Sequence, residues 1–217
     1  MDSPITRSFI TGVSPITMSD LISGYNIGKS VSLHPAFSRA LGFTKDDVIA
    51  MVEYYRSKGM IFHPTEYLLE IMTQWYGNYR FNGDDNETLF NPDMVLYFLN
   101  NYTLKKELPE DLIDWNARID YEKLKHLIIL DRDSTKSTNR NFSMLKRIME
   151  EGGTSTKIVE GFSLEELLEL ENLTSLLFYL GLLTVKGPDR DKLRLEIPNE
   201  TARRLFFDYI KEVTGAE

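Results

Sequence analysis

Leu182-Leu183-Thr184-Val185-Lys186 and Leu193-Arg194-Leu195-Glu196-Ile197 are two short apolar stretches separated by the loop Gly187-Pro188-Asp189-Arg190-Asp191. Runs of this length, bounded by glycine, proline and aspartate, are typical of the two strands of a hairpin. Helical patterns precede and follow the hairpin. Helices, then a hairpin, then a helix is the order of elements in a winged helix, so this stretch decides the fold that we predict for the second half of the chain.

The helices around this hairpin are predicted from apolar residues at three- and four-residue spacing. Gly152-Gly153 is expected to end the second of them, and Ser163 begins the third, with Glu166 in the capping-box position. Asn172 is expected to cap the fourth. The predicted helices span Tyr121–Ile128, Phe142–Met149, Ser163–Leu168, Leu173–Leu180 and Pro198–Val213.

The first half of the chain combines one short strand with three helices. Arg7–Val13 reads as a strand, and the stretch from 17 to 35 reads as irregular. Thr44 with Asp47 forms a capping box, and Asn91-Pro92 places a cap before a proline at the first helical position. The three helices are predicted to begin at Thr44, Pro64 and Asn91, and Leu108–Asn116 follows them as a connector.

The composition indicates an ordinary globular protein. Of the 217 residues, 42% are hydrophobic and 27% are charged, which is enough apolar material for a core. The chain has no cysteine, so disulfides and thiolate chemistry are excluded. Met1–Pro4 lacks the basic flank of a signal peptide, and the most apolar run, Leu173–Val185, is too short to cross a bilayer. We therefore expect a cytoplasmic protein, whose net charge of -8 disfavours general phosphate binding.

The stretch Ser23–Ser30 is a near-copy of a phosphate-binding loop. That loop needs Gly, four residues and then Gly-Lys-Ser/Thr, because its backbone N–H groups and its lysine hold the phosphates. Here serine stands at the leading position, the preceding residues read as helical or irregular, and His34-Pro35 prevents a helix after the stretch. The chain alone is therefore not expected to be an ATPase.

A second motif, Asp131-Arg132-Asp133-Ser134-Thr135, resembles the nucleophile motif of haloacid-dehalogenase-type phosphatases, in which the first aspartate attacks phosphorus. That motif normally ends the first strand of a parallel sheet, whereas here it follows a helical pattern. We interpret it as a helix end that leads into a charged loop. His34, His63 and His126 show no ligand spacing, so we predict no metal site and no catalytic residue.

Nucleic-acid binding is judged by the helix that a winged helix would place in the major groove. That helix, Leu173–Leu180, has no lysine or arginine and has two apolar faces, so we predict that it is buried. Basic residues do occur in the hairpin, but acidic residues interleave with them, which favours a solvated face or a protein contact over DNA. The candidate contacts to nucleic acid or to a partner are Lys186, Arg190, Lys192 and Arg194.

Several segments taken together resemble one family. They are Phe9–Ile16, Ser23–Ile27, Leu41–Thr44, Trp75–Phe81, Phe90–Pro92, Phe178–Val185 and Ile197–Asn199. In this order they are similar to bacterial AAA-ATPase-like proteins that are often fused to a C-terminal restriction-endonuclease-like nuclease domain. The resemblance covers nearly the whole chain. It departs from the family at Gly77-Asn78, where Asn or Asp followed by Gly is usual.

The resemblance implies a place for this chain in such a protein. The phosphate-binding loop and the acidic Mg²⁺ strand lie upstream in the family, and the nuclease lies downstream. ATP and Mg²⁺ are thus implied for a full-length relative, and no cofactor for this chain alone. Arg7–Val13 would be the sensor strand of the ATPase core, with Thr11 and Ser14 as nucleotide-sensing residues. Without its sheet neighbours this strand would be an exposed edge, which predicts pairing with the same chain or with a second copy in a homodimer.

We therefore predict a mainly α chain with a small β component in three parts. These are a remnant of the ATPase core (1–60), a helical lid (61–116) and a winged-helix-like domain (117–217). The expected function is that of a non-catalytic C-terminal portion of an AAA-ATPase-like protein, which couples the nucleotide state to a nuclease or protein partner. Two alternatives remain open: a stand-alone protein-interaction module, and weak nucleic-acid binding through the hairpin.

Overall fold

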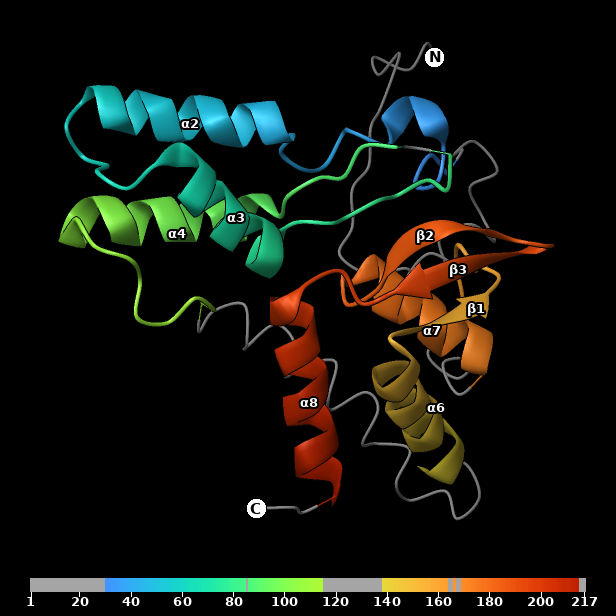
Figure 1. Cartoon of the computed structure of the whole chain (residues 1–217). Coiled ribbons are helices and arrows are strands. Elements are labelled where there is room, and N and C mark those ends of the chain that lie inside the picture. Colours follow the sequence, from blue (N-terminus) through green and yellow to red (C-terminus); the bar gives the residue numbers. More distant parts are fainter. Residues whose placement is uncertain (1–29, 85, 115–137, 164–165, 167–168, 215–217) are drawn as a thin grey trace, which may run out of the picture.

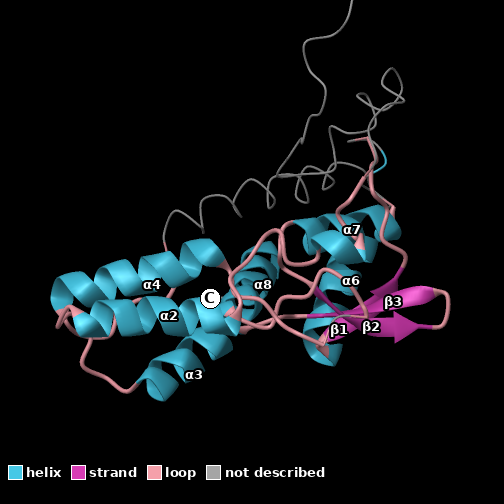
Figure 2. Cartoon of the chain, turned by 90° about the horizontal axis from the view of Figure 1, so that it is seen from above, coloured by secondary structure: helices cyan, strands magenta, loops and turns pink. Residues whose placement is uncertain are grey.

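The computed structural model describes residues 30–84, 86–114, 138–163, 166 and 169–214 (Figure 1). Within these ranges the chain is mainly helical and holds one small sheet of three antiparallel strands, which confirms the predicted fold class at this level. The helices of the first half lie together on one side of the molecule, and the sheet lies on the other with the helices of the second half (Figures 1 and 2). The predicted strand Arg7–Val13 and the predicted helix Tyr121–Ile128 lie outside the described residues.

The helices of the first half begin where the sequence predicts. They are α2 (Lys45–Ser57), α3 (Thr65–Tyr76) and α4 (Pro92–Lys105). The short 3₁₀ helix η2 (Pro35–Phe37), which was not predicted, precedes them. Thr44 caps α2 in a capping box, because Thr44 Oγ1 accepts the Asp47 N–H at 3.2 Å and Asp47 Oδ2 accepts the Thr44 N–H at 2.9 Å. Asn91 Oδ1 caps α4 by accepting the N–H groups of Asp93 and Met94. Both predicted caps are confirmed.

One apolar core joins α2, α3 and α4. Each helix turns a stripe of three- and four-residue spacing toward it. The predicted boundary at residue 60 falls between α2 and α3, which share this core, and the predicted connector packs against it through Leu108 and Leu112. The buried members of this first core are Val48, Val52, Ile61, Leu68, Met72, Tyr76, Phe90, Met94, Val95, Phe98, Leu99 and Tyr102.

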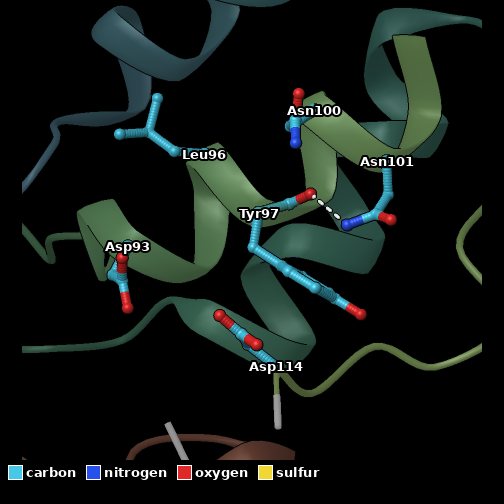
Figure 3. A pocket seen from close by; sticks show the side chains of 6 residues that line it. All are labelled: Asp93, Leu96, Tyr97, Asn100, Asn101 and Asp114. Atoms are coloured by element: carbon cyan, nitrogen blue, oxygen red, sulfur yellow. Dashed lines mark hydrogen bonds between the residues drawn. The ribbon is translucent and has the colours of Figure 1, made fainter. Parts of the chain in front are cut away.

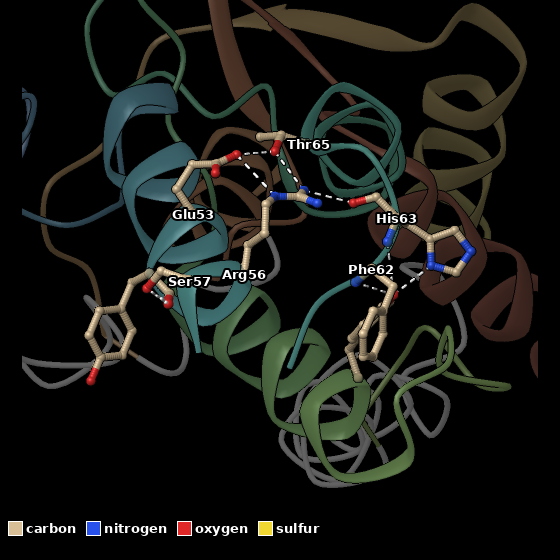
Figure 4. A network of polar contacts seen from close by, with 8 residues as sticks. Glu53, Arg56, Ser57, Phe62, His63 and Thr65 are labelled. Atoms are coloured by element: carbon tan, nitrogen blue, oxygen red, sulfur yellow. Dashed lines mark hydrogen bonds and ion pairs between the residues drawn. The ribbon is translucent and has the colours of Figure 1, made fainter. Parts of the chain in front are cut away.

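Polar contacts hold the loop between α2 and α3 against this core (Figure 4). Glu53 accepts hydrogen bonds from Thr65 and, at 3.3 Å, from Arg56 Nε. Arg56 Nη2 donates to His63 O at 2.7 Å. The Tyr102 hydroxyl accepts the His63 N–H at 3.3 Å and lies 2.5 Å from His63 Nδ1. His63 is therefore part of the packing of this loop.

The second half folds around the sheet. Its elements are α6 (Thr138–Glu151), β1 (Gly153–Thr156), α7 (Leu170–Tyr179), β2 (Thr184–Asp189), β3 (Lys192–Glu196) and α8 (Glu200–Thr214). β3 lies between β1 and β2 and is antiparallel to both. Leu195 of β3 is fully buried in a second core, to which Ile148 of α6, Leu173 of α7 and Phe206 of α8 also belong.

Two details of the predicted second half are corrected. Gly152 ends α6 with a φ of +71°, as expected of a helix stop, but the four residues after it form β1. Gly-Thr-Ser-Thr lacks the apolar alternation by which a strand is recognised. α7 begins at Leu170 with Glu169 at its N-cap, three residues earlier than predicted. Asn172 does not cap it, because its side chain donates to Glu166 O at 2.7 Å.

The hairpin is tighter than the sequence predicts. β2 runs to Asp189 and β3 begins at Lys192, which leaves the two-residue turn Arg190-Asp191 in place of a five-residue loop. Arg190 adopts a left-handed φ of +56°, the conformation that such short turns require. A shift in register between Val185 and Gly187 lets β2 pair with β3 through Gly187 and Pro188.

Candidate functional site at the junction of three helix ends

The end of α3 is bonded by Asn199, which immediately precedes α8, and by Thr201 in the first turn of α8. The last carbonyl groups of a helix have no partners within that helix and need partners from elsewhere. Thr201 Oγ1 donates to Trp75 O at 2.7 Å, and Asn199 Nδ2 donates to Gly77 O at 2.9 Å. Both donors are buried. The first turn of α8 therefore caps the C-terminal end of α3, although more than 120 residues separate them.

The N-terminal end of α4 meets the same point. The Asn91 N–H donates to Tyr76 O at 2.8 Å, while its side chain caps α4. Asn199 is also a cap, because its Oδ1 accepts the Ala202 N–H at 3.1 Å. The N-terminal ends of α4 and α8 carry partial positive charge, and the C-terminal end of α3 carries partial negative charge. The meeting of these three ends is therefore electrostatically favourable.

The turn after α3 explains the order Gly77-Asn78. A Cβ on Gly77 would lie 2.8 Å from Thr73 O and 3.3 Å from a ring carbon of Phe90, so a side chain does not fit there. Asn78 takes the left-handed conformation with a φ of +68°. Asparagine adopts this conformation more readily than most residues. Close packing thus places the glycine first and the asparagine second.

Tyr79 lies at the centre of the junction. Its side chain is 8% exposed, and its ring lies against Gly181, whose missing Cβ would stand 3.6 Å from the ring. Burial raises the pKa of the Tyr79 phenol, and hydrogen bonds from the side chains of Asn199 and Asn91 act in the opposite direction. The two helix-capping asparagines therefore both face this phenol, one from each half of the chain.

Residues 79–83, which we call the strap, tie the first core to the sheet. Arg80 O accepts the Val185 N–H at 3.2 Å and the Thr184 hydroxyl at 3.0 Å, so the strap covers the edge of β2. On its other side, Tyr79 exchanges two backbone hydrogen bonds with Leu89, at 2.8 and 3.0 Å. The sheet thus continues by short bridges into the first half of the chain.

α8 contacts the two cores in different ways. Ala202, Leu205 and Phe206 are buried in the second core. Toward α3, in contrast, the described contacts include the two capping hydrogen bonds and the Arg204 guanidinium, which lies 4.4 Å from the centre of the Trp75 ring. An arginine over the face of a tryptophan is a favourable cation–π arrangement. The apolar face of α8 therefore belongs to one core and its polar first turns bind the other.

The four basic residues predicted as contacts lie on the hairpin, outside this junction. Lys186 Nζ is paired with Glu196 Oε2 at 2.7 Å. Arg190 and Lys192 are exposed at the turn, and Arg194 is half-buried on β3. The interleaving acidic residues are engaged as well, Asp189 with Ser155 Oγ at 2.5 Å and Asp191 with Lys157 at 3.2 Å. The hairpin is thus a surface of mixed charge.

The prediction that the helix before the hairpin is buried is confirmed. All residues of Leu173–Phe178 in α7 are buried. Its polar side chains bond within the second half, because Thr174 Oγ1 donates to Leu170 O at 2.6 Å and Ser175 Oγ accepts the Val159 N–H at 2.8 Å. α7 therefore has no exposed face with which to enter a groove of DNA.

Several predicted sites lie outside the described residues. These include Thr11 and Ser14, the Ser23–Lys29 part of the near-copy of a phosphate-binding loop, and the aspartates of Asp131–Thr135. Over the ranges that the structure describes, no three histidine, aspartate or glutamate side chains gather as a metal site requires.

The outer face of α4 carries an open hollow of about 500 Å³ (Figure 3). The Tyr97 hydroxyl donates to Asp111 O at 3.0 Å, and Asn101 Nδ2 donates to Tyr97 O at 2.9 Å. Both charged residues of the lining are carboxylates, so the hollow does not suit the phosphates of a nucleotide. It is lined by Asp93, Leu96, Tyr97, Asn100, Asn101 and Asp114.

No family model, curated protein or solved structure matches this chain. None of the helices in the described ranges is long and apolar enough to span a membrane. The geometry of the junction is consequently the main guide to what the chain does.

Proposed function

We propose that this chain is the non-catalytic C-terminal portion of a cytoplasmic AAA-ATPase-like protein. In this role it couples the nucleotide state of an upstream ATPase core to a nuclease or another protein partner. The observation that carries the proposal is the junction, in which the first turn of α8 bonds the end of α3 directly. A displacement of either core would change the energy of these bonds, and this change would couple the position of one core to that of the other.

The order of elements in the second half supports a winged-helix-like domain. α6, β1, α7, β2 and β3 follow one another, the sheet order is β1-β3-β2, and the two-residue turn between β2 and β3 would be the tip of the wing. α2, α3 and α4 form a compact helical unit around one core, as a lid next to an ATPase core requires. Both features are expected of the family that the sequence resembles.

Buried polar side chains at the junction favour coupling over catalysis. Asn199, Thr201 and Thr184 each bond a backbone carbonyl of another element. Groups used in this way hold elements together and are not available to a substrate. We therefore propose that this chain alone is not an enzyme, and that ATP and Mg²⁺ are bound by an upstream segment.

The proposal is tested by supplying that segment. A chimera joins the Gly-x-x-x-x-Gly-Lys-Ser/Thr loop and acidic Mg²⁺ strand of a bacterial AAA-ATPase-like protein in front of Met1. We expect calorimetry to give at least about tenfold tighter binding of ATP with Mg²⁺ than for this chain alone, since the added loop supplies the phosphate contacts. The control replaces the lysine of the added loop by alanine. Equal affinity of the chimera and this chain would contradict the proposal.

A stand-alone protein-interaction module is the second candidate. Large apolar side chains are exposed around the loop between α2 and α3, with Phe62 61% and Tyr67 42% exposed.

Weak nucleic-acid binding through the hairpin is disfavoured by the mixed charge of its surface. That candidate predicts a salt-sensitive gel shift that is lost when Lys192 and Arg194 are replaced by glutamine. Absence of any shift at low salt removes it.

A further inference from the structure

The two cores are separate apolar clusters. In the described part of the chain no buried residue belongs to both, since the first core ends with Tyr102 and the second begins with Met144. Phe81 of the strap packs against the second core. If the strap stays with that core, moving the two units relative to each other exposes less apolar surface than opening either unit. Any large motion of the described residues is therefore expected between the cores.

The contact between α3 and α8 is of a kind that water can replace. Among the described residues it includes hydrogen bonds to carbonyl groups at the end of a helix and one arginine over a tryptophan ring. Carbonyl groups at helix ends are commonly solvated, and an intramolecular hydrogen bond is only modestly better than one to water. This contact is consequently weaker than the apolar packing on either side of it.

The backbone provides a pivot beside this contact. Asn78 is exposed and has a left-handed backbone conformation. It lies between Gly77, whose carbonyl accepts a hydrogen bond from Asn199, and the strap, which is hydrogen-bonded to β2. A change of the Asn78 dihedral angles, together with one between Leu89 and α4, would separate Gly77 from α8 and leave the strap and Leu89 on the sheet. Hinges generally consist of a few such residues at the end of an element.

We propose that the junction is a hinge with a closed and an open position, and that Asn199 is the latch that holds it closed. In the open position α8 stays with the second core, and the end of α3 is solvated. The part that this hinge plays in coupling rests on the proposed function. The motion itself is a property of this chain and is tested without nucleotide, so either idea can fail alone.

Asn199→Asp removes the hydrogen bond to Gly77 O, which is the latch, and keeps the hydrogen bond from the Ala202 N–H, which caps α8. Aspartate is as good an N-cap as asparagine, so its carboxylate still accepts the Ala202 N–H and keeps α8 intact. It cannot donate to Gly77 O, and it places a carboxylate oxygen against that carbonyl oxygen. The variant should therefore open the hinge without unravelling α8.

The experiment measures the distance between the two cores by pulsed electron paramagnetic resonance. The chain has no cysteine, so Glu70→Cys on α3 and Lys146→Cys on α6 give one spin label in each core. Both side chains are exposed. We expect one narrow distance in the parent, and in Asn199→Asp a second, different distance with the ratio of open to closed raised by about tenfold.

A matched control and a second variant complete the test. Asn101→Ala removes an asparagine that also bonds a carbonyl at 2.9 Å, but within α4, and it should leave the distances unchanged. Thr201→Val removes the bond to Trp75 O with a side chain of the same shape, and a smaller open population is expected. If Asn199→Asp fails to fold, Thr201→Val decides. A single unchanged distance in the folded variants would overturn the hinge.

Discussion

The two cores and the junction between them are held by different forces. Inside the first core, Tyr76, Phe98 and Tyr102 are completely buried and pack ring against ring. At the junction, side-chain amides and hydroxyls bond backbone carbonyls at helix ends. The cores thus depend on apolar area and shape, and the junction depends on a few directed bonds.

This difference separates stability from coupling. Removing apolar volume costs several times more than losing one hydrogen bond to water. Substitutions in a core should therefore unfold that core, whereas substitutions at the junction should change how the cores are joined.

The largest effect is expected for Phe98→Ala. Phe98 is fully buried on α4, so its removal leaves a cavity in the first core. The free energy of unfolding should fall by about 3–5 kcal/mol. Urea unfolding followed by circular dichroism measures it, with the exposed Leu96→Ala on the same helix as control. A loss below about 1 kcal/mol would show that the first core is not packed as described.

Gly77→Ala tests the close approach at the end of α3. A Cβ there would lie 2.8 Å from Thr73 O, which forces the backbone to move. Overpacking of this kind costs about 1–3 kcal/mol. Gly187→Ala is the matched control, since a Cβ on Gly187 would meet nothing within 4 Å. Equal unfolding midpoints in urea for the two variants would contradict the account of this turn.

Arg204→Met tests the cation–π contact and keeps most of the length of the side chain. The free energy of unfolding should fall by about 0.5–1 kcal/mol. The fluorescence emission of Trp75 should also change, because the guanidinium group over its ring is gone. Arg203→Met, one position earlier on α8 and exposed, is the control. An unchanged tryptophan spectrum in Arg204→Met would exclude this contact in solution.

The smallest effect concerns the capping box of α2. Hydrogen bonds from the Thr44 side chain and backbone lower the pKa of Asp47 below its ordinary value of 3.8. Because the folded chain favours the carboxylate, its contribution to stability is complete above pH 3.8 and is lost as the pH falls through the lowered folded value. The difference in unfolding free energy between the parent and Asp47→Asn should therefore narrow below that pH. A difference that does not change with pH would exclude the role of this carboxylate.

Local signals predicted the helix ends well. Thr44 with Asp47 and Asn91-Pro92 carry their own capping chemistry, so they could be recognised without tertiary information. β1 could not, because its threonines form a strand only when β3 is there to pair with it. Asn172 looks like a cap for the same local reason, but α7 begins at Leu170, so Asn172 lies in its first turn and its side chain bonds Glu166 O.

The contacts of the candidate site could not be predicted from the sequence, because they also depend on tertiary structure. Asn199 was predicted as the start of a helix, yet nothing near it indicates that its amide reaches Gly77, because that contact depends on how the cores meet. The one local signal was the order Gly77-Asn78. It indicated an unusual turn, and the close approach of Thr73 and Phe90 gives its physical reason.

The central claim is that a polar junction joins two independently packed cores, and native-state hydrogen exchange of Asn199→Asp tests it most directly. The account predicts faster exchange at the amide of Gly77, because the open position exposes the end of α3 to solvent, whereas the amide of Ala202 keeps its protection because aspartate still caps α8. The amides of Leu99 in the first core and Leu195 in the second should keep the protection of the parent. Unchanged exchange at the junction, or an equal loss of protection in both cores, would contradict the account.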